Sequence, residues 1–192
     1  VDSGHLRIYN YNGTKWTQLG GDIDGEVASD FSGWSVSLSS DGKTLAVGAK
    51  LNDGNGSESG HVRIYNYNGT EWTQLGEDID GEVASDYSGW SVSLSSDGKT
   101  VAIGAIYNAG NGTNSGHVRI YNYSDTEWVQ LSGDINGEAA GDQSGYSVSL
   151  SSDGKTIAIG AIGNDGNGAS SGHVRIYNYD GSTWTQLGED IN

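Results

Sequence analysis

The sequence contains no cysteine, no proline and no methionine, and only one phenylalanine among its 192 residues. Without cysteine the chain can form no disulfide, no thiolate metal site and no cysteine nucleophile, although this absence does not decide the compartment. Glycine, by contrast, is abundant, with 32 residues. Collagen needs glycine at every third position together with proline, so this glycine content instead indicates many tight turns.

Basic residues are also scarce. Nine Lys and Arg residues stand against 25 Asp and Glu residues, which gives a formal net charge of −16. Such a chain repels the phosphates of nucleic acids and anionic lipid surfaces, and it suits a salty medium or one rich in divalent cations. No apolar run approaches the roughly 18 residues that a membrane helix needs. We therefore expect neither nucleic-acid binding nor membrane insertion.

Signals of catalysis and of targeting are missing as well. The chain has no Gly-x-Ser-x-Gly elbow and no phosphate-binding loop, and no repeat differs from the others as an active site would require. We expect that the protein is not an enzyme and that it requires no cofactor. No signal peptide is visible and the chain begins at Val1, so we expect a processed product or part of a longer chain.

What the sequence does contain is a 56-residue repeat without insertions. The tetrapeptide Ser-Gly-His-Leu/Val begins at four equally spaced positions: Ser3, Ser59, Ser115 and Ser171. No segment has a helical period. Each unit instead alternates apolar and polar residues over short runs, and turn signals such as Asn68-Gly69 and Asp97-Gly98 separate these runs. The repeat therefore predicts an all-β protein.

We expect four strands in the unit that begins at Ser59. Their predicted ranges are His61–Tyr67, Glu71–Leu75 (with an extension to Ile79 as an alternative), Trp90–Ser95 and Thr100–Ala105. In the last of these, Val101 and Ile103 alternate with Ala102 and Gly104, a pattern that suits a sheet covered on both faces. Four antiparallel strands at a period slightly above 50 predict propeller-type blades. A β-solenoid is the competing architecture, but its coils are usually much shorter.

The residues also carry a family resemblance. The stretch Tyr87–Ala105, with Asp86 before it, resembles the FG-GAP repeat of integrin-α-type β-propellers, in which an aromatic-Gly pair opens the inner strand and Gly-Ala closes the next. The Gly-His-Val-Arg-Ile-Tyr-Asn-Tyr run is similar to the third strand of that family. The match recurs at Phe31–Ala49 and Gln143–Ala161. The resemblance implies a secreted or cell-surface protein that serves as an adhesion or interaction module.

One feature of the family is changed. Calcium-binding FG-GAP blades carry a long Asp-x-Asp-x-Asp-Gly loop, whereas this chain has the short turn Ser95–Thr100, with equivalents that begin at Ser39 and Ser151. One carboxylate beside a lysine cannot supply the six to eight oxygens that calcium prefers. The family's calcium site should therefore not be carried over to this turn.

The resemblance also sets the phase of the blades. We expect complete blades over residues 25–80, 81–136 and 137–192, preceded by the two outer strands of another blade over residues 1–24. Propellers typically need four to eight blades, so three blades and two strands cannot close a ring alone. The predicted partners are therefore other copies of the chain or further repeats of a longer chain.

Clusters of acidic residues recur where calcium could bind. The candidate metal ligands are Asp22, Asp24, Glu26, Asp30, Asp78, Asp80, Glu82 and Asp86, with Asp134, Glu138 and Asp142 in the next unit. Spaced oxygen ligands are what calcium needs, but a solvated acidic loop explains the same residues. The four histidines, His5, His61, His117 and His173, are expected to be structural because metal-bound histidines normally have partner ligands nearby.

Two further sets of residues are candidates for ligands or modification. Aromatic side chains on the expected outer strands could stack on carbohydrate, although repeated aromatics usually pack between blades; these are Trp16, Trp72, Trp128 and Trp184. Asn-x-Ser/Thr sequons, which matter only in a eukaryotic secretory pathway, stand at Asn12, Asn55, Asn68, Asn111 and Asn122.

The sequence thus predicts a non-enzymatic, extracellular or cell-surface repeat module with a structural, adhesive or protein-interaction role, within a larger propeller, oligomer or fibre. The alternative is a lectin-like or cation-dependent ligand-binding propeller, for which calcium at the acidic loops and an extracellular protein or glycan partner are expected.

Overall fold

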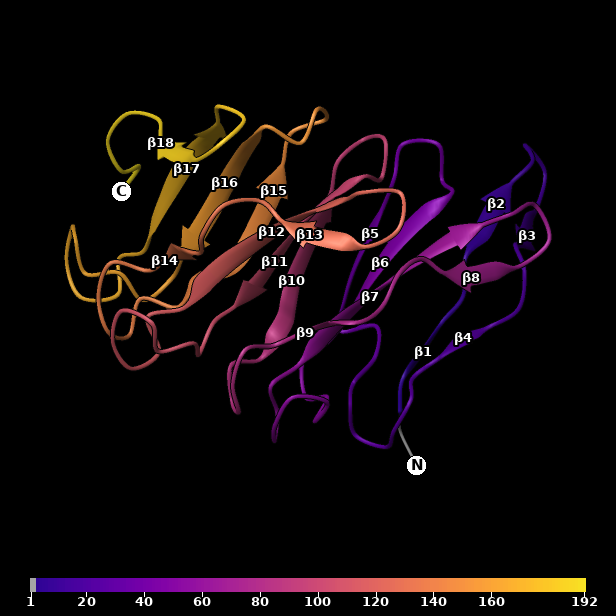
Figure 1. Ribbon diagram of the computed structural model, residues 1–192, viewed down its shortest axis with the longest axis horizontal. Coiled ribbons are helices and arrows are strands. Elements are labelled where there is room, and N and C mark those ends of the chain that lie inside the picture. The colour runs from indigo at the N-terminus through magenta and orange to yellow at the C-terminus, as the bar shows by residue number, and fades with distance from the viewer. Residues whose placement is uncertain (1–2) are drawn as a thin grey trace.

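The computed structural model describes residues 3–192, so the first two residues of the predicted 1–24 segment lie outside the described residues. Every regular element in this part of the chain is a β-strand, and none is a helix that could cross a membrane. The sheets lie side by side in chain order, with the two ends of the chain on opposite sides of the molecule (Figure 1). The predicted all-β fold of antiparallel blades is confirmed.

Three successive sheets form the blades, which we number in chain order. Blade 1 contains β5 (Ser35–Leu38), β6 (Thr44–Ala49), β7 (His61–Tyr67), β8 (Trp72–Gln74) and β9 (Ile79–Asp80). Blade 2 contains β10 (Ser88–Leu94), β11 (Thr100–Ala105), β12 (His117–Tyr123), β13 (Trp128–Gln130) and β14 (Ile135–Asn136). Blade 3 contains β15 (Ser144–Leu150), β16 (Thr156–Ala161), β17 (His173–Tyr179) and β18 (Trp184–Gln186).

The N-terminal unit, residues 3–24, contains only the equivalents of the outer strands: β1 (His5–Leu6), β2 (Tyr9–Tyr11), β3 (Trp16–Gln18) and β4 (Ile23–Asp24). Here β1 and β2 together correspond to the continuous strand β7. The strand is broken because no neighbour equivalent to β6 pairs with it along its length, whereas β6 pairs with six residues of β7.

The fourth strand of each blade follows the shorter of the two predicted ranges. It is not one continuous strand from Glu71 to Ile79: β8 and β9 are separate, and both pair with β7. In the β7–β9 pairing, His61 lies opposite Asp80 and Val62 opposite Ile79. The loop between β8 and β9 therefore brings Asp78 close to the start of β7.

The alternation of large and small side chains determines how the blades stack. Val101 and Ile103 of β11 belong to a buried cluster with Ala46, Val62 and Ile64 of blade 1. Ala102, on the opposite face of β11, belongs to a second cluster that includes Val118 and Ile120 of blade 2 and Ile157 and Ile159 of blade 3. We call each interface between consecutive units a seam. Seam 1 joins the N-terminal unit to blade 1, and seams 2 and 3 follow in chain order.

Close backbone approach at the seams explains one recurrent glycine. A Cβ atom on Gly104 would overlap the carbonyl oxygen of Gly145 in the next blade, so a side chain is excluded there. Hydrogen bonds join the same inner strands: Ser91 Oγ donates to the Gly145 carbonyl at 2.7 Å, and Leu150 N donates to Ser93 Oγ at 3.0 Å. Close backbone contact and these hydrogen bonds therefore hold blades 2 and 3 together at seam 3.

Candidate functional site

Each seam carries the same group of three polar side chains. The groups are Glu26–His61–Asp78, Glu82–His117–Asp134 and Glu138–His173–Asp190. We call them the Glu–His–Asp clusters. In each one the candidate ligand atoms, one nitrogen and two oxygens, all lie within 4.8 Å of one another. The Glu–His–Asp cluster is the only kind of candidate metal-binding group among residues 3–192.

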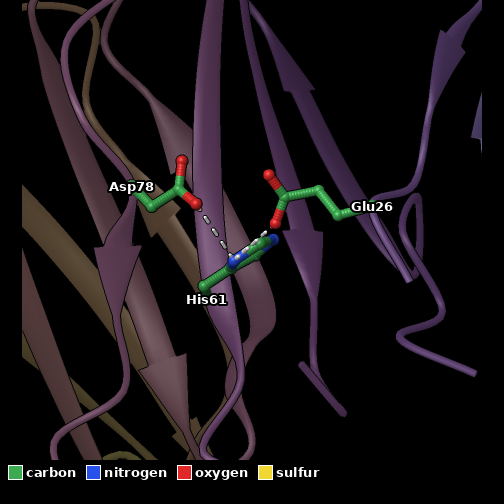
Figure 2. Close-up of side chains that lie close together, drawn as sticks. All are labelled: Glu26, His61 and Asp78. Carbon is green, nitrogen blue, oxygen red and sulfur yellow. Dashed lines mark ion pairs between the residues drawn. The ribbon is translucent and has the colours of Figure 1, made fainter. Parts of the chain in front are cut away.

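The three side chains of a cluster come from both sides of a seam. Glu26 follows β4 of the N-terminal unit, His61 begins β7, and Asp78 precedes β9. Figure 2 shows the imidazole of His61 with the two carboxylates on either side of it. His61 Nδ1 lies 3.5 Å from Asp78 Oδ2 and 4.0 Å from Glu26 Oε2. Both distances exceed the usual length of a hydrogen bond.

The other two clusters have the same geometry. His117 Nδ1 lies 3.7 Å from Glu82 and 3.8 Å from Asp134. His173 Nδ1 lies 3.7 Å from Glu138 and 3.5 Å from Asp190. Three independent copies of the sequence thus place the same atoms at nearly the same separations.

The three imidazoles are buried, and the ring nitrogens of two of them have no hydrogen-bond partner. The side chain of His117 is 1% exposed, and so is that of His173. Neither ring nitrogen of either residue has a hydrogen-bond partner. Burial, reinforced by the charge of Arg119, lowers the pKa of His117 to about 4 despite the opposing effect of Asp134. Burial likewise lowers the pKa of His61. Burial therefore favours the neutral form of both rings, in which one nitrogen has a free lone pair.

The carboxylates are held in place by neighbours that use only one of their two oxygens. Asp78 Oδ1 accepts a 2.6 Å hydrogen bond from Gln74, whereas Oδ2 faces His61. Glu26 Oε1 lies 3.4 Å from the guanidinium of Arg63, whereas Oε2 faces the histidine. Arg63 also donates to the backbone carbonyl of Asp24 across the seam at 3.0 Å.

Seam 1 has an additional acidic cavity of about 530 Å³. Its walls include Glu26, Asp30, Asp53, Asp78 and Asp80. In seam 2 the equivalents of Asp53 and Asp80 are uncharged: Ala109 and Asn136. Burial, followed by repulsion from Asp134, raises the pKa of Glu82 in seam 2. Seam 1 therefore has two more carboxylates near its Glu–His–Asp cluster than seam 2 has.

Other acidic residues predicted as metal ligands do not form a common site with their neighbours in the sequence. Asp30 is buried and accepts hydrogen bonds from Asn52 Nδ2 at 2.9 Å and from the Val27 amide at 3.3 Å. Asp86 makes the equivalent bonds to Asn108 and Val83. These two carboxylates stabilise the loops that contain them.

In the N-terminal unit the predicted ligand Asp22 pairs instead with Arg7, whose Nη2 lies 2.8 Å from Oδ2. The hydrogen bond from Arg7 is the largest cause that lowers the pKa of Asp22 to about 2. Asp24 is exposed, and its backbone carbonyl contacts Arg63. Of the eight residues predicted as ligands, Glu26, Asp78 and Glu82 belong to Glu–His–Asp clusters.

Sequence reasoning did not foresee that carboxylates lie beside the histidines. They were expected to be structural for lack of nearby ligands, and that reason is wrong for His61, His117 and His173, since two carboxylates face each of them. A signal was present in the repeat itself. The Glu, His and Asp of the cluster occur in every complete unit, whereas the neighbouring Asp80 becomes Asn136 and then Asn192.

The shortened calcium loop does not fit calcium. Asp97 Oδ1 accepts hydrogen bonds from Ser95 Oγ at 2.6 Å and from the Lys99 amide at 3.0 Å, so this carboxylate is used within its own turn. One carboxylate with these donors lacks the oxygen ligands that calcium prefers. Calcium at the acidic loops stays a prediction.

The outer tryptophans connect neighbouring units. The indole N–H of Trp72 donates to the Leu19 carbonyl at 2.9 Å, and that of Trp128 donates to the Leu75 carbonyl at 2.8 Å. Trp184 makes the same contact with the carbonyl of Leu131 in blade 2 at 3.2 Å. Trp16, in the N-terminal unit, is 67% exposed. Carbohydrate binding by this series stays a prediction.

The predicted sequons lie on loops and strand ends. The side-chain amides of Asn55, Asn111 and Asn122 donate to backbone carbonyls, at 2.8 Å for Asn55 to Gly81. Asn12 and Asn68 are exposed in tight turns, where their side-chain oxygens accept backbone N–H groups. Their glycosylation stays a prediction.

Comparison with known proteins identifies the repeat. The FG-GAP repeat model matches three segments, residues 23–65, 79–121 and 136–177, which together make up more than half of the chain. The chain belongs to the FG-GAP repeat family. This assignment confirms the resemblance seen in the sequence, and it indicates an interaction- or adhesion-type repeat module. No curated protein sequence matches the chain.

Solved structures show the same fold at low sequence identity. Hydrazine synthase from Kuenenia stuttgartiensis aligns with a TM-score of 0.60 at 17% identity, covering 97% of this FG-GAP chain and 42% of the synthase chain. A Bacteroides fragilis protein designated a 6-phosphogluconolactonase aligns with a TM-score of 0.66 at 14% identity, covering 98% of this chain and 49% of the other. The chain thus spans less than half of either structure, and at these identities the likeness concerns the fold alone.

Proposed function

We propose that the chain is a non-enzymatic interaction module of the extracellular space or cell surface. Its blades pack onto further blades of the same kind, either from a second copy or from further repeats, and so complete a larger propeller or fibre. The observation that carries this proposal is the match between the two open ends of the blade stack and the surfaces buried at its seams.

The first open face lies on β5. Trp34, Val36 and Leu38 are 46%, 52% and 47% exposed. The equivalent Leu94 on β10 is buried, because β10 packs on β5 and β6 of the blade before it. The described part of the N-terminal unit, residues 3–24, has no inner strands that could cover β5 in the same way.

The second open face lies on blade 3. Ile162 and Leu187 are 48% and 51% exposed. Their equivalents in blade 2 are Ile106, which is 1% exposed, and Leu131, whose carbonyl accepts the indole N–H of Trp184. Because the repeats are nearly identical, the exposed residues of blade 3 correspond to the residues of blade 2 that pack against blade 3. The two ends are therefore complementary.

The mass and shape of the native particle test the proposal. We expect light scattering to give a mass above that of one 20.1 kDa chain, and electron microscopy to show a ring or a fibre. The substitution Leu38→Asp should release smaller particles, because it places a charge on the open face of β5. Val83→Asp is the matched control, since Val83 is similarly exposed, at 56%, but lies outside the strands. A compact monomer of about one chain's mass at all concentrations would contradict the proposal.

The location and the kind of partner need a separate test. Accessibility of the protein to protease or antibody on intact cells should be high if the module acts at the cell surface. Protection of the protein until the cells are lysed would contradict that part of the proposal, without affecting the assembly of blades.

A further inference from the structure

The Glu–His–Asp clusters have features that neither an interaction module nor a stable core requires. A buried histidine normally donates or accepts a hydrogen bond. Here His117 and His173 are almost fully buried, have no hydrogen-bond partner at either ring nitrogen, and direct Nδ1 between two carboxylates. We propose that each cluster binds a divalent transition-metal ion of the zinc class, which His Nδ1 and one oxygen each of Glu and Asp coordinate.

The separations between the ligand atoms support a bridging ion rather than direct hydrogen bonds. The six Nδ1-to-oxygen distances run from 3.5 to 4.0 Å. Hydrogen bonds between these atoms would be about 2.7–3.2 Å long. Ligands that each lie about 2.0–2.1 Å from one zinc ion at a tetrahedral angle would be about 3.4 Å apart. The observed distances between nitrogen and oxygen are therefore slightly longer than those of a metal-bound set. A small movement of the side chains toward the ion would bring them to that length.

The surrounding side chains prepare each carboxylate as a ligand. Gln130 donates to Asp134 Oδ1 at 2.7 Å, and Gln186 donates to Asp190 Oδ1 at 2.8 Å, as Gln74 does to Asp78. In every cluster the remaining Asp oxygen is the one that faces the histidine. Orientation of metal ligands by such outer hydrogen bonds is typical of protein metal sites.

The donor set selects the class of metal. One imidazole nitrogen with two carboxylate oxygens suits zinc and its neighbours in the first transition row, whereas calcium prefers six to eight oxygens. The cluster has a route to solvent, because the Glu side chains are 39–43% exposed and the Asp side chains 27–29% exposed. Water can therefore supply the remaining ligands.

The nearby charges differ between the seams and predict an order of affinity. In seam 1, Glu26, Asp78 and Asp80 are opposed by the single cation Arg63. In seam 2, Asn136 stands where seam 1 has Asp80, while the cation Arg119 is retained. We therefore expect the tightest binding in seam 1.

The N-terminal unit supplies a control within the same chain. His5 is exposed, and its neighbour Asp22 uses Oδ2, the oxygen that faces histidine in the complete clusters, to bind Arg7. No glutamate of a preceding blade reaches this position among the described residues. His5 should therefore not bind the ion.

Titration of the full chain, freed of metal with a chelator, with zinc chloride tests the proposal. Calorimetry and native mass spectrometry should give three ions per chain. The variant Glu82→Gln should lower this number by one, or weaken one site by at least about tenfold, because it keeps the shape of the side chain but removes a charged ligand. His117→Ala should do the same, and His5→Ala should leave all three sites intact.

Two further readouts keep the test decisive if His117→Ala fails to fold. Zinc should shift the Nδ1 resonance of His117 in ¹⁵N spectra of the unaltered protein, and Glu82→Gln should abolish that shift while the far-ultraviolet circular dichroism stays unchanged. Calcium at the same concentration should displace little zinc. Three sites of unchanged affinity in Glu82→Gln, an equal loss in His5→Ala, or equal competition by calcium would overturn the proposal.

Discussion

The N-terminal unit and blade 1 contain nearly the same sequence in different surroundings. Tyr9 is 46% exposed in the former, whereas its equivalent Tyr65 is 7% exposed in the latter. His5 is exposed and His61 is buried. The difference arises because β7 has an inner neighbour, β6, whereas none of the residues from 3 to 192 forms such a neighbour for β1 and β2. A residue of this repeat thus acquires its role from the strands and the blade packed against it.

The hydrogen bonds of equivalent arginines also depend on the neighbouring blade. Arg7 turns toward Asp22 of its own unit and is exposed. Arg119 is buried and donates to the Asp80 carbonyl of the preceding blade at 2.6 Å. The guanidinium finds an acceptor across the seam only where a preceding blade exists. Substitutions at equivalent positions should therefore have unequal effects, and that inequality can be measured.

The largest difference is expected at the inner glycines. Gly104→Ala should lower the free energy of unfolding by about 3 kcal/mol or more, because its Cβ would overlap the Gly145 carbonyl and neither backbone can yield without separating blades 2 and 3. Gly160→Ala, at the equivalent position of blade 3, meets only the side chain of Ser147 and should cost much less. Urea unfolding of both variants measures the difference.

The result at Gly160 also bears on the proposed assembly. If further blades cover blade 3 in the native particle, Gly160→Ala should weaken the assembly even though it leaves a single chain stable. Equal losses of unfolding free energy for the two variants in a protein shown to be monomeric would contradict the assignment of Gly104 to a tight seam.

The sequence predicted the blades well because the information is local. The alternation of Val101 and Ile103 with Ala102 and Gly104 encodes both faces of β11, and the structure places the large residues toward blade 1 and Ala102 and Gly104 toward blade 3. The Asn68-Gly69 signal likewise ends β7 at Tyr67, and Asn68 Oδ1 accepts the Thr70 amide.

The Glu–His–Asp clusters could not be derived in the same way. Glu82, His117 and Asp134 are far apart in the chain, and they meet only through the β12–β14 pairing and the packing of blade 2 on blade 1. The four acidic residues from Asp22 to Asp30 are close in sequence but have different partners. Asp22 pairs with Arg7, Asp30 bonds to Asn52, and Glu26 belongs to the cluster at seam 1. Proximity in sequence was a poor guide because the loop turns its carboxylates in different directions.

An intermediate difference is expected at the seam arginines. Arg119→Ala should lower the free energy of unfolding by about 2 kcal/mol, since it removes a charged donor from a partly buried carbonyl of the preceding blade. Arg7→Ala should change stability little, because its ion pair is exposed to solvent. Thermal melting of both variants in low and high salt makes the comparison. A larger loss for Arg7→Ala would show that the N-terminal unit is covered in solution.

The smallest difference is expected at the outer tryptophans. Trp128→Phe keeps the aromatic ring that packs against Tyr123 but removes the indole N–H that donates to the Leu75 carbonyl. We expect a loss of about 1 kcal/mol in the free energy of unfolding, the usual contribution of one such hydrogen bond. Trp16→Phe is the matched control, because Trp16 packs against Tyr11 in the same way but is largely exposed.

Both variants can be followed by urea unfolding, with tyrosine fluorescence and circular dichroism as independent signals. A loss for Trp128→Phe alone would place the hydrogen bond across seam 2 among the contacts that hold consecutive blades together. Equal losses at low protein concentration, where the chain is dissociated, would mean that the ring packing, which both positions share, carries the whole effect. Because the native particle should cover the N-terminal unit with another blade, the loss at Trp16 should approach that at Trp128 as protein concentration rises and assembly proceeds.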